Sequence, residues 1–225
     1  MEPTQPTKTT VHIRPANFNR ALFRIRGTAP LVINAFSAKA RNKIHETQAA
    51  GTVARGKKIR PCKDFKALFE DAKHVSTDGW DGFSASAIRN AMISACRLVG
   101  FKMTLAKLSV FVEADGYDRI DKITPLIRIT KGVAEYSEMP ARNDDGSIDL
   151  RARPMYSPGW EAEVLIRWDA DQFSVEDVAN LLDRVGNQVG IGEGRPDSKN
   201  SAGMGWGTFT VVGTVEKTDK KSKKT

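Results

Sequence analysis

Cysteine and histidine are scarce in this sequence, which limits the redox and metal chemistry it can support. The 225 residues include two cysteines, Cys62 and Cys96, and three histidines. Two cysteines cannot form a disulfide framework, and Cys96 lies in an apolar helical pattern that favours a buried thiol. Neither residue type shows HxH, HExxH or CxxC spacing, so we expect no metal and no cofactor. The same scarcity indicates a reducing, intracellular setting.

The sequence also lacks long apolar runs and the common motifs of hydrolytic enzymes. No run approaches the about 20 apolar residues that cross a bilayer, and the N-terminal MEPTQPTKTT lacks the apolar core of a signal peptide. There is no GxSxG nucleophile elbow, and Asp144 and Asp145 lie in a turn signal where such side chains cap the backbone. We therefore expect a cytoplasmic protein that makes no membrane contact and has no catalytic residues.

Positive charge, by contrast, is concentrated in two segments. The net charge is +8, and residues 36–63 alone carry +7, because eight cations stand against one acid, Glu46. The tail 217–225 carries +4, which leaves −3 for the rest of the chain. Localised positive charge favours a polyanionic partner, although a solvated loop and tail would have the same composition. In the first segment the cations are Lys39, Arg41, Lys43, Arg55, Lys57, Lys58, Arg60 and Lys63.

Hydrophobic periodicity predicts an α+β domain. Residues 84–100 have a helical apolar stripe, with Ser84 as the N-cap and Gly100 as the stop. A second helix follows Ser174, which forms a capping box with Asp177. Strand patterns, one of them edge or bulged because of Pro125, occupy 21–27, 107–116, 122–130, 160–170 and 208–216. The resulting β-α-β-β-α-β order predicts a ferredoxin-like (RRM-like) arrangement, with two helices on one face of an antiparallel sheet.

The remaining segments are predicted to surround this core without forming a second one. A segment at 131–159 is polar, holds the turn signal NDDG and reads as a projecting hairpin arm. We expect a disordered N-terminus at 1–10, one domain at 11–216 with a basic insertion at 36–82, and a disordered lysine-rich tail at 217–225.

A glycine-rich stretch, VGIGEGRPDSKNSAGMGWGTF, occupies residues 189–209 and is called the glycine loop below. It follows a helix and precedes a strand, so it has no helix N-terminus to hold a pyrophosphate and is neither a Rossmann nor a P-loop fingerprint. Three interpretations remain: a phosphate cradle, a flexible connection, or a place where another backbone comes very close. Six glycines together with Arg195 and Lys199 favour a loop that follows phosphates.

Two motifs resemble the RAMP superfamily (repeat-associated mysterious proteins), especially the repeating backbone subunits of CRISPR effector complexes. FSASAIRNAM at 83–92 is similar to the family's helix-start motif P-G-S-S-[LI]-[KR]-G-A-[LM]. The glycine loop resembles the family's loop between the second helix and the last strand, and APLVINAF resembles the segment after the first strand. In the helix-start motif, Ser86, Ile88, Arg89, Ala91 and Met92 match, whereas Ser84, Ala85, Ala87 and Asn90 depart from it.

The resemblance implies a binding site for single-stranded nucleic acid. Backbone subunits of the family stack into filaments along RNA, and a hairpin called the thumb intrudes between nucleotides. If the roles of the family's segments are carried over to this sequence, Arg89 and the glycine loop would face phosphates. The basic segment would extend the groove, and the arm would be the thumb. Tyr136 or Tyr156 would stack on bases, or would pack at the root of the arm. Outside the basic segment, the nucleic-acid-binding residues implied are Arg89, Arg151, Arg153, Gly190, Gly192, Gly194, Arg195, Lys199, Gly203 and Gly205.

The sequence thus predicts a non-catalytic protein that binds single-stranded RNA or DNA through its phosphates and self-associates into a helical filament along the strand. No aspartate lies between Phe36 and Lys63, where target-cleaving members of the family keep a catalytic one. Four alternatives stay open: a phage strand-annealing factor, a CRISPR effector component, an anti-CRISPR mimic that joins effector subunits, and a RAMP-type endoribonuclease. A stand-alone phage or prophage relative in a bacterial host cell would fit the compact length.

Overall fold

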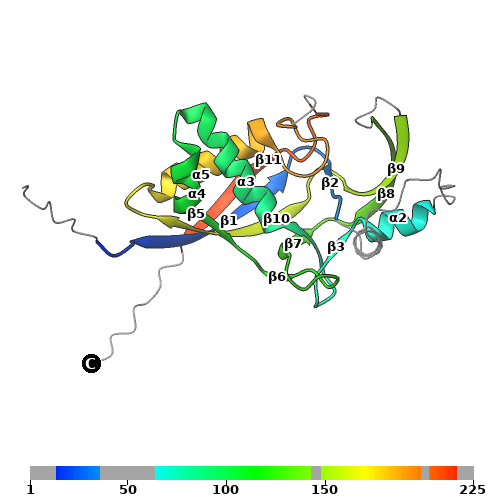
Figure 1. Ribbon diagram of the computed structural model, residues 1–225, viewed down its shortest axis with the longest axis horizontal. Helices are drawn as coiled ribbons and strands as arrows, with labels where there is room; N and C mark the ends of the chain where they lie inside the picture. The colour runs from blue at the N-terminus through cyan, green and yellow to red at the C-terminus, as the bar shows by residue number, and fades with distance from the viewer. Residues whose placement is uncertain (1–13, 36–63, 143–147, 199–202, 217–225) are drawn as a thin grey trace, which may run out of the picture.

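The chain forms a mixed α+β structure around one large antiparallel sheet (Figure 1). The computed structural model describes residues 14–35, 64–142, 148–198 and 203–216, and every structural statement below concerns those residues. None of the helices described is long and apolar enough to cross a membrane. The helices are α2 (Phe65–Asp71), α3 (Ala85–Ala95), α4 (Met103–Ser109) and α5 (Val175–Arg184).

Two long strands, β1 and β10, lie at the centre of the large sheet. β1 pairs antiparallel with β10 on one side and with β11 on the other, and β10 pairs with β5 near its C-terminal end. At its N-terminal end β10 pairs with β7, which continues the sheet through β4 to β3. The strands are β1 (Phe18–Gly27), β3 (His74–Val75), β4 (Asp81–Ser84), β5 (Val110–Glu113), β6 (Gly116–Tyr117), β7 (Pro125–Lys131), β10 (Glu161–Asp169) and β11 (Phe209–Glu216).

Helices α3 and α5 begin where the local sequence provides caps. Ser84 accepts a hydrogen bond from the backbone of Ser86, and Ser174 and Asp177 form the predicted capping box. A 3₁₀ turn, Cys96–Val99, extends α3 and ends at Gly100 in the left-handed conformation, as the sequence predicts. A π-helical turn, Val185–Val189, extends α5 into the glycine loop.

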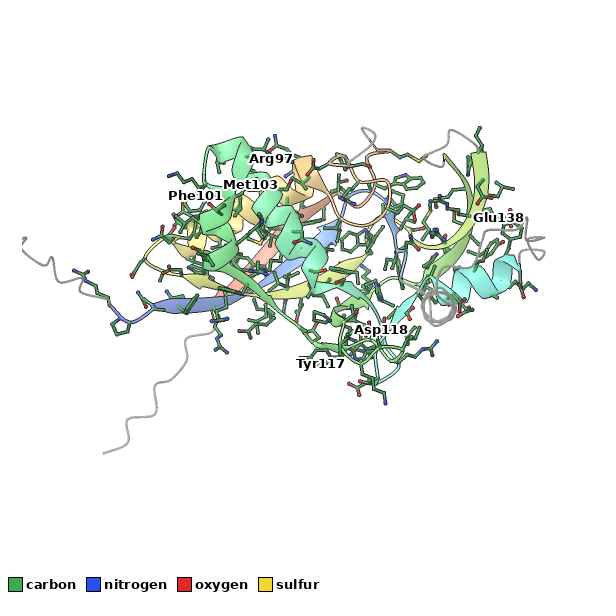
Figure 2. The ribbon with its side chains drawn as sticks, viewed as in Figure 1. Arg97, Phe101, Met103, Tyr117, Asp118 and Glu138 are labelled. Atoms are coloured by element: carbon green, nitrogen blue, oxygen red, sulfur yellow. The ribbon has the colours of Figure 1, made fainter. Side chains whose placement is uncertain are left out.

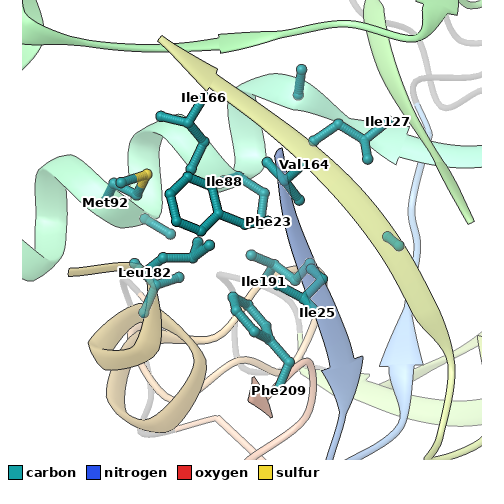
Figure 3. Packing of buried hydrophobic residues seen from close by; sticks show 14 of the residues in the cluster. Phe23, Ile25, Ile88, Met92, Ile127, Val164, Ile166, Leu182, Ile191 and Phe209 are labelled. Atoms are coloured by element: carbon teal, nitrogen blue, oxygen red, sulfur yellow. The ribbon is translucent and has the colours of Figure 1, made fainter. Parts of the chain in front are cut away.

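The core lies between these two helices and one face of the sheet (Figure 3). Strand alternation directs Phe23 and Ile25 of β1 and Val164 of β10 toward the helices, and all three are fully buried. Ile88 of α3 and Leu182 of α5 meet them from the other side. Each such side chain contributes about 1.5–3 kcal/mol of burial. Cys96 is also buried, as predicted, and burial raises the pKa of its thiol.

A second, three-stranded sheet carries the arm. β2 (Leu31–Val32), β9 (Ile148–Tyr156) and β8 (Ala134–Arg142) pair in that order, and the β8–β9 hairpin lies within the predicted segment 131–159. The arm projects beside the large sheet, with α2 packed against β9 (Figure 1).

Several short elements differ from the sequence prediction. Residues 107–109, predicted as strand, are the end of α4, and β5 begins only at Val110. β7 was predicted to be an edge strand or a bulged one, and it is not an edge strand, because it lies between β10 and β4. Pro125 is tolerated because it is the first residue of β7. The register between β7 and β10 is irregular where β7 meets Glu161. The predicted insertion 36–82 contributes β3 and part of β4 to the sheet.

Candidate functional site

A groove separates the helical layer from the glycine loop. Its main hollow, about 500 Å³ in volume, lies between α3, α4 and the loop. Small and apolar side chains such as Ala87, Ala91 and Ile191 line it. Its polar and charged lining residues are Asn90 and Ser94 of α3, Lys107 of α4, and Arg195 and Asp197 of the loop.

The loop wall is shaped by close contacts between backbones. A Cβ on Gly207 would lie 1.7 Å from the carbonyl oxygen of Ile191, and one on Gly192 would lie 2.4 Å from that of Val32. Positive φ angles, which favour glycine, occur at Gly190, Gly192, Gly194, Gly203, Gly205 and Gly207. Of the three interpretations of this loop, the close approach of another backbone is therefore confirmed for its described residues. The phosphate cradle and the flexible connection stay predictions.

Several backbone N–H groups of the loop are used within the protein. Gly190 donates to Val185 O at 2.7 Å, Glu193 to Val32 O at 2.9 Å, and Gly207 to Pro30 O at 2.7 Å. The N–H of Gly190 therefore already donates within the protein, and the predicted phosphate contact of Gly190 stays a prediction. Phosphate contacts by Gly192, Gly194, Gly203 and Gly205 stay predictions.

Asp197 fastens the loop to helix α3. Its carboxylate accepts hydrogen bonds from Ser94 Oγ at 2.5 Å and from Arg97 Nη2 at 2.8 and 3.0 Å. Figure 2 labels Arg97 on the helical side of the molecule. The hydrogen bond from Ser94, then that from Arg97 with its charge and the charge of Arg195, lowers the pKa of Asp197 despite partial burial. The groove wall is thus held by a charge-assisted contact.

Glu193 fastens the other side of the loop to the arm. Its carboxylate lies 2.8 Å from Arg153 Nε and 3.7 Å from Arg151 Nη1, both on β9. The structure therefore brings together the loop and these two predicted arm residues, but both arginines already have an acid partner. To bind a phosphate, Arg151 and Arg153 would have to release the carboxylate of Glu193 or contact the phosphate and that carboxylate together.

The other predicted cations are placed as follows. Arg89 donates to two backbone carbonyls, Val110 O at 3.0 Å and Lys107 O at 2.6 Å, so its guanidinium ties α3 to the end of α4. Arg195 donates to Gly192 O at 3.1 Å and lines the hollow. Outside the described residues lie Lys39, Arg41, Lys43, Arg55, Lys57, Lys58, Arg60, Lys63 and Lys199.

Sequence reasoning missed Lys107, which the structure places in the groove. It is exposed, lines the hollow, and has no acid partner among the described residues. No sequence signal marked it, because residues 107–116 alternate like a strand.

A smaller hollow of about 140 Å³ continues the groove toward β3. It shares Ala87, Ile191 and Gly192 with the main hollow and is also lined by Asn34, His74 and Ser84. His74 Nδ1 lies 2.7 Å from Asp118 Oδ2, and Asp118 is only 4% exposed. Figure 2 labels Asp118 in the β6–β7 connection, at the edge of the large sheet.

The two arm tyrosines differ in their surroundings. Tyr156 is only 1% exposed, and its hydroxyl donates to Asp81 Oδ2 at 3.2 Å, so it packs at the root of the arm and base stacking by it is excluded. Burial and the charge of Asp81 raise the pKa of Tyr156 strongly. Tyr136 is 47% exposed and meets Phe69 edge to face at 5.5 Å. Its hydrogen bond to Glu138 raises the pKa of Tyr136 to about 12.

In the part of the chain that the structure describes, no group of three or more His, Cys, Asp or Glu side chains is arranged to hold a metal ion.

Comparisons with known proteins identify a similar fold and no family. No family model matches the chain, and no curated protein matches it. Among solved structures, it is similar to a chain in the cryo-EM structure of the Type III-B Cmr-beta bound to cognate target RNA, with a TM-score of 0.54 and 10% sequence identity. The match covers 88% of this chain and 60% of that one. The chain therefore shares the fold of a subunit of an RNA-bound Cmr assembly, over somewhat more than half of that subunit's length.

Proposed function

We propose that this chain binds single-stranded nucleic acid in the groove between α3, α4 and the glycine loop, through phosphate contacts and without catalysis. The observation that carries the proposal is the hollow of about 500 Å³, whose lining includes the cations Lys107 and Arg195. The similar fold in an RNA-bound assembly supports it. Phosphate contacts are independent of base identity, so binding would tolerate any sequence.

We further propose that the central unit is a ferredoxin-like domain of RAMP type. Its elements follow the order β1, α3, β5, β10, α5, β11, and its strands are arranged β11-β1-β10-β5. The first and third strands of such a domain are central neighbours, as β1 and β10 are here. The helix-start motif and the glycine loop flank the groove from α3 and from the end of α5, which supports the resemblance to backbone subunits.

Self-association along the strand belongs to the same proposal. Neighbouring copies would bind consecutive stretches of one oligonucleotide, with the β8–β9 arm reaching toward the next copy. Negative-stain images of the full chain with and without long single-stranded RNA or DNA would test this point. Filaments in the presence of either polymer support it, and single particles in all samples contradict it.

Binding itself is tested by fluorescence anisotropy with labelled 30-mers of uridine and thymidine at low salt. Lys107→Glu reverses a charge inside the groove and is expected to weaken binding about tenfold or more. Lys102→Glu makes the same change on an exposed residue next to α4 that does not line the hollow, and its effect is expected to be smaller. No binding by the unmodified chain, or equal losses in both variants, would contradict the proposal.

A further inference from the structure

His74 and Asp118 form a fixed hydrogen-bonded pair at the end of the groove. Asp118 Oδ2 lies 2.7 Å from His74 Nδ1, while its Oδ1 accepts the backbone N–H of Ile120 at 2.9 Å. A carboxylate can only accept, so Nδ1 carries a proton and donates it to Asp118. The carboxylate thereby selects which ring nitrogen is left for a ligand.

The backbone around this pair is held firmly. His74 lies in β3, where it pairs with Gly82 of β4. The following turn is closed by buried Ser76, whose hydroxyl accepts from the backbone N–H of Asp78 at 3.1 Å and of Trp80 at 3.2 Å. The imidazole is therefore positioned before any ligand arrives, which is what recognition of one small group requires.

The second ring nitrogen, Nε2, is the one left for a ligand, and His74 is among the residues that line the smaller hollow. His74 lines that hollow, its side chain is 14% exposed, and Nε2 has no hydrogen-bond partner among the described residues. Since every buried side-chain nitrogen and oxygen described has a partner, Nε2 must reach solvent. The hollow adjoins the main one through Ala87, Ile191 and Gly192, so a strand that extended along both hollows would pass His74.

We propose that His74 Nε2 hydrogen-bonds a ribose 2′-hydroxyl and so makes the groove select single-stranded RNA over DNA. This inference rests on the proposed function and specifies its ligand. In the neutral ring Nε2 accepts the hydroxyl proton, and in the protonated ring Nε2–H donates to the hydroxyl oxygen. A 2′-hydroxyl satisfies both forms, whereas the C2′ methylene of DNA satisfies neither.

The decisive comparison uses oligonucleotides that differ only at the 2′ position. Anisotropy titrations of the full chain with 30-mers of uridine and deoxyuridine isolate the hydroxyl, because base and phosphate are unchanged. We expect uridine to bind about 2- to 10-fold more tightly, the range of one net hydrogen bond. A 2′-fluorouridine 30-mer keeps the RNA-like sugar pucker but cannot donate a proton, and it is expected to bind like deoxyuridine.

Variants of His74 connect the preference to this residue. His74→Phe and, should it fold poorly by circular dichroism, His74→Leu lack a hydrogen-bonding group and are expected to bring the affinity ratio of uridine to deoxyuridine close to one. Deoxyuridine affinity should stay unchanged. Lys107→Gln is the matched control, since it should weaken both polymers equally and leave the ratio intact.

The outcomes separate this inference from the proposed function. Failure to bind either polymer refutes both. Equal binding of uridine and deoxyuridine, or a preference that survives His74→Phe and His74→Leu, refutes only the assignment of His74. If the wild-type chain binds 2′-fluorouridine as tightly as uridine, the preference comes from sugar pucker, and the assignment of His74 is again refuted. If the wild-type chain shortens the RNA and His74→Phe does not, His74 takes part in cleavage, and the proposal that it only recognises the 2′-hydroxyl is refuted.

Discussion

The groove and the open face of the large sheet both carry arginines, and in the groove the charges line a hollow. On the open face, which points away from the helices, Arg24 pairs with Glu163 at 2.9 Å and Arg26 with Glu161 at 3.0 Å. Arg167 lies 4.6 Å above the ring of Phe18 and 4.6 Å above that of Phe111. These cations neutralise acids and cover aromatic rings, so a polyanion gains little there.

In the groove the acids have a different role. Asp197 and Glu193 hold the two sides of the glycine loop to α3 and to β9, which leaves Lys107 exposed in the hollow. The difference teaches that counting cations does not locate a phosphate site: their pairing and the shape of the surface decide it. The four predictions that follow test this difference, from the largest expected effect to the smallest.

Gly207→Ala should cause the largest change, because it breaks the groove wall. A Cβ at Gly207 would lie 1.7 Å from Ile191 O at a φ of 68°, so we expect a loss of at least about 3 kcal/mol in the free energy of unfolding. Gly205→Ala is the matched control: its φ is 75° but no atom lies within 4 Å, and about 1–2 kcal/mol is expected. Equal losses in urea denaturation would show that the loop is not packed as described.

Lys107→Gln and Arg24→Gln make the same charge change in the two regions. The first removes an exposed cation from the hollow and should weaken oligonucleotide binding about 3- to 10-fold at low salt. The second removes a cation that already serves Glu163, so its effect should stay below about 1.5-fold. Anisotropy titrations measure both, and a larger loss for Arg24→Gln would reverse the assignment of the binding face.

Arg167→Gln should affect stability without affecting binding. The guanidinium covers Phe18 and Phe111 and lies 3.6 Å from Glu113, and stacking at a partly exposed site contributes about 0.5–1 kcal/mol per ring. We expect a loss of about 1 kcal/mol in thermal or urea unfolding, with unchanged affinity for oligonucleotides. A clear loss of affinity would indicate that the open face also contacts the ligand.

The smallest effect concerns acid stability. The pKa of Asp197 is lowered, so its contribution is present above the ordinary value of 3.8 and is lost as the pH falls through the lower folded-state value. Asp197→Asn should therefore lose less stability than wild type on acidification below about pH 4, a difference under about 0.5 kcal/mol after solvent screening. Glu161→Gln on the open face should likewise lose less stability than wild type on acidification. Burial raises the pKa of Glu161, but the hydrogen bonds and charges of Lys131 and Arg26 outweigh burial and lower that pKa. If the free energy of unfolding of both variants depends on acidic pH in the same way as that of wild type, these ion contacts are contradicted.

The parts of the fold that sequence predicts are those with local causes. The capping residues Ser84 and Ser174, the stop at Gly100 and the strand alternation of β1 and β10 act within a few residues, and all are present. The sequence does not predict helix α4, because residues 107–116 alternate like a strand. In the structure Arg89 of α3 donates to the carbonyls of Lys107 and Val110 at the end of α4, a contact between distant segments that no periodicity reveals.

The site is less predictable from sequence, because its contacts join distant segments. The pairs Ser94–Asp197 and His74–Asp118 are separated by 103 and 44 residues, and no periodicity reveals such a pairing. The glycine loop was recognised, but its glycines serve backbone packing at Val32 and Ile191 as much as any ligand. Arg151 and Arg153 were chosen for their charge, and only the structure shows that Glu193 faces them.

Photochemical crosslinking tests the location of the ligand most directly. A single-stranded 30-mer containing 4-thiouridine would be irradiated with the full chain, and the crosslinked peptides would be mapped by mass spectrometry. We predict crosslinks in α3, α4 and the glycine loop, and their loss in competition with unlabelled uridine 30-mer. Crosslinks confined to the open-face strands β1 and β10, with none in α3, α4 or the loop, would contradict the account.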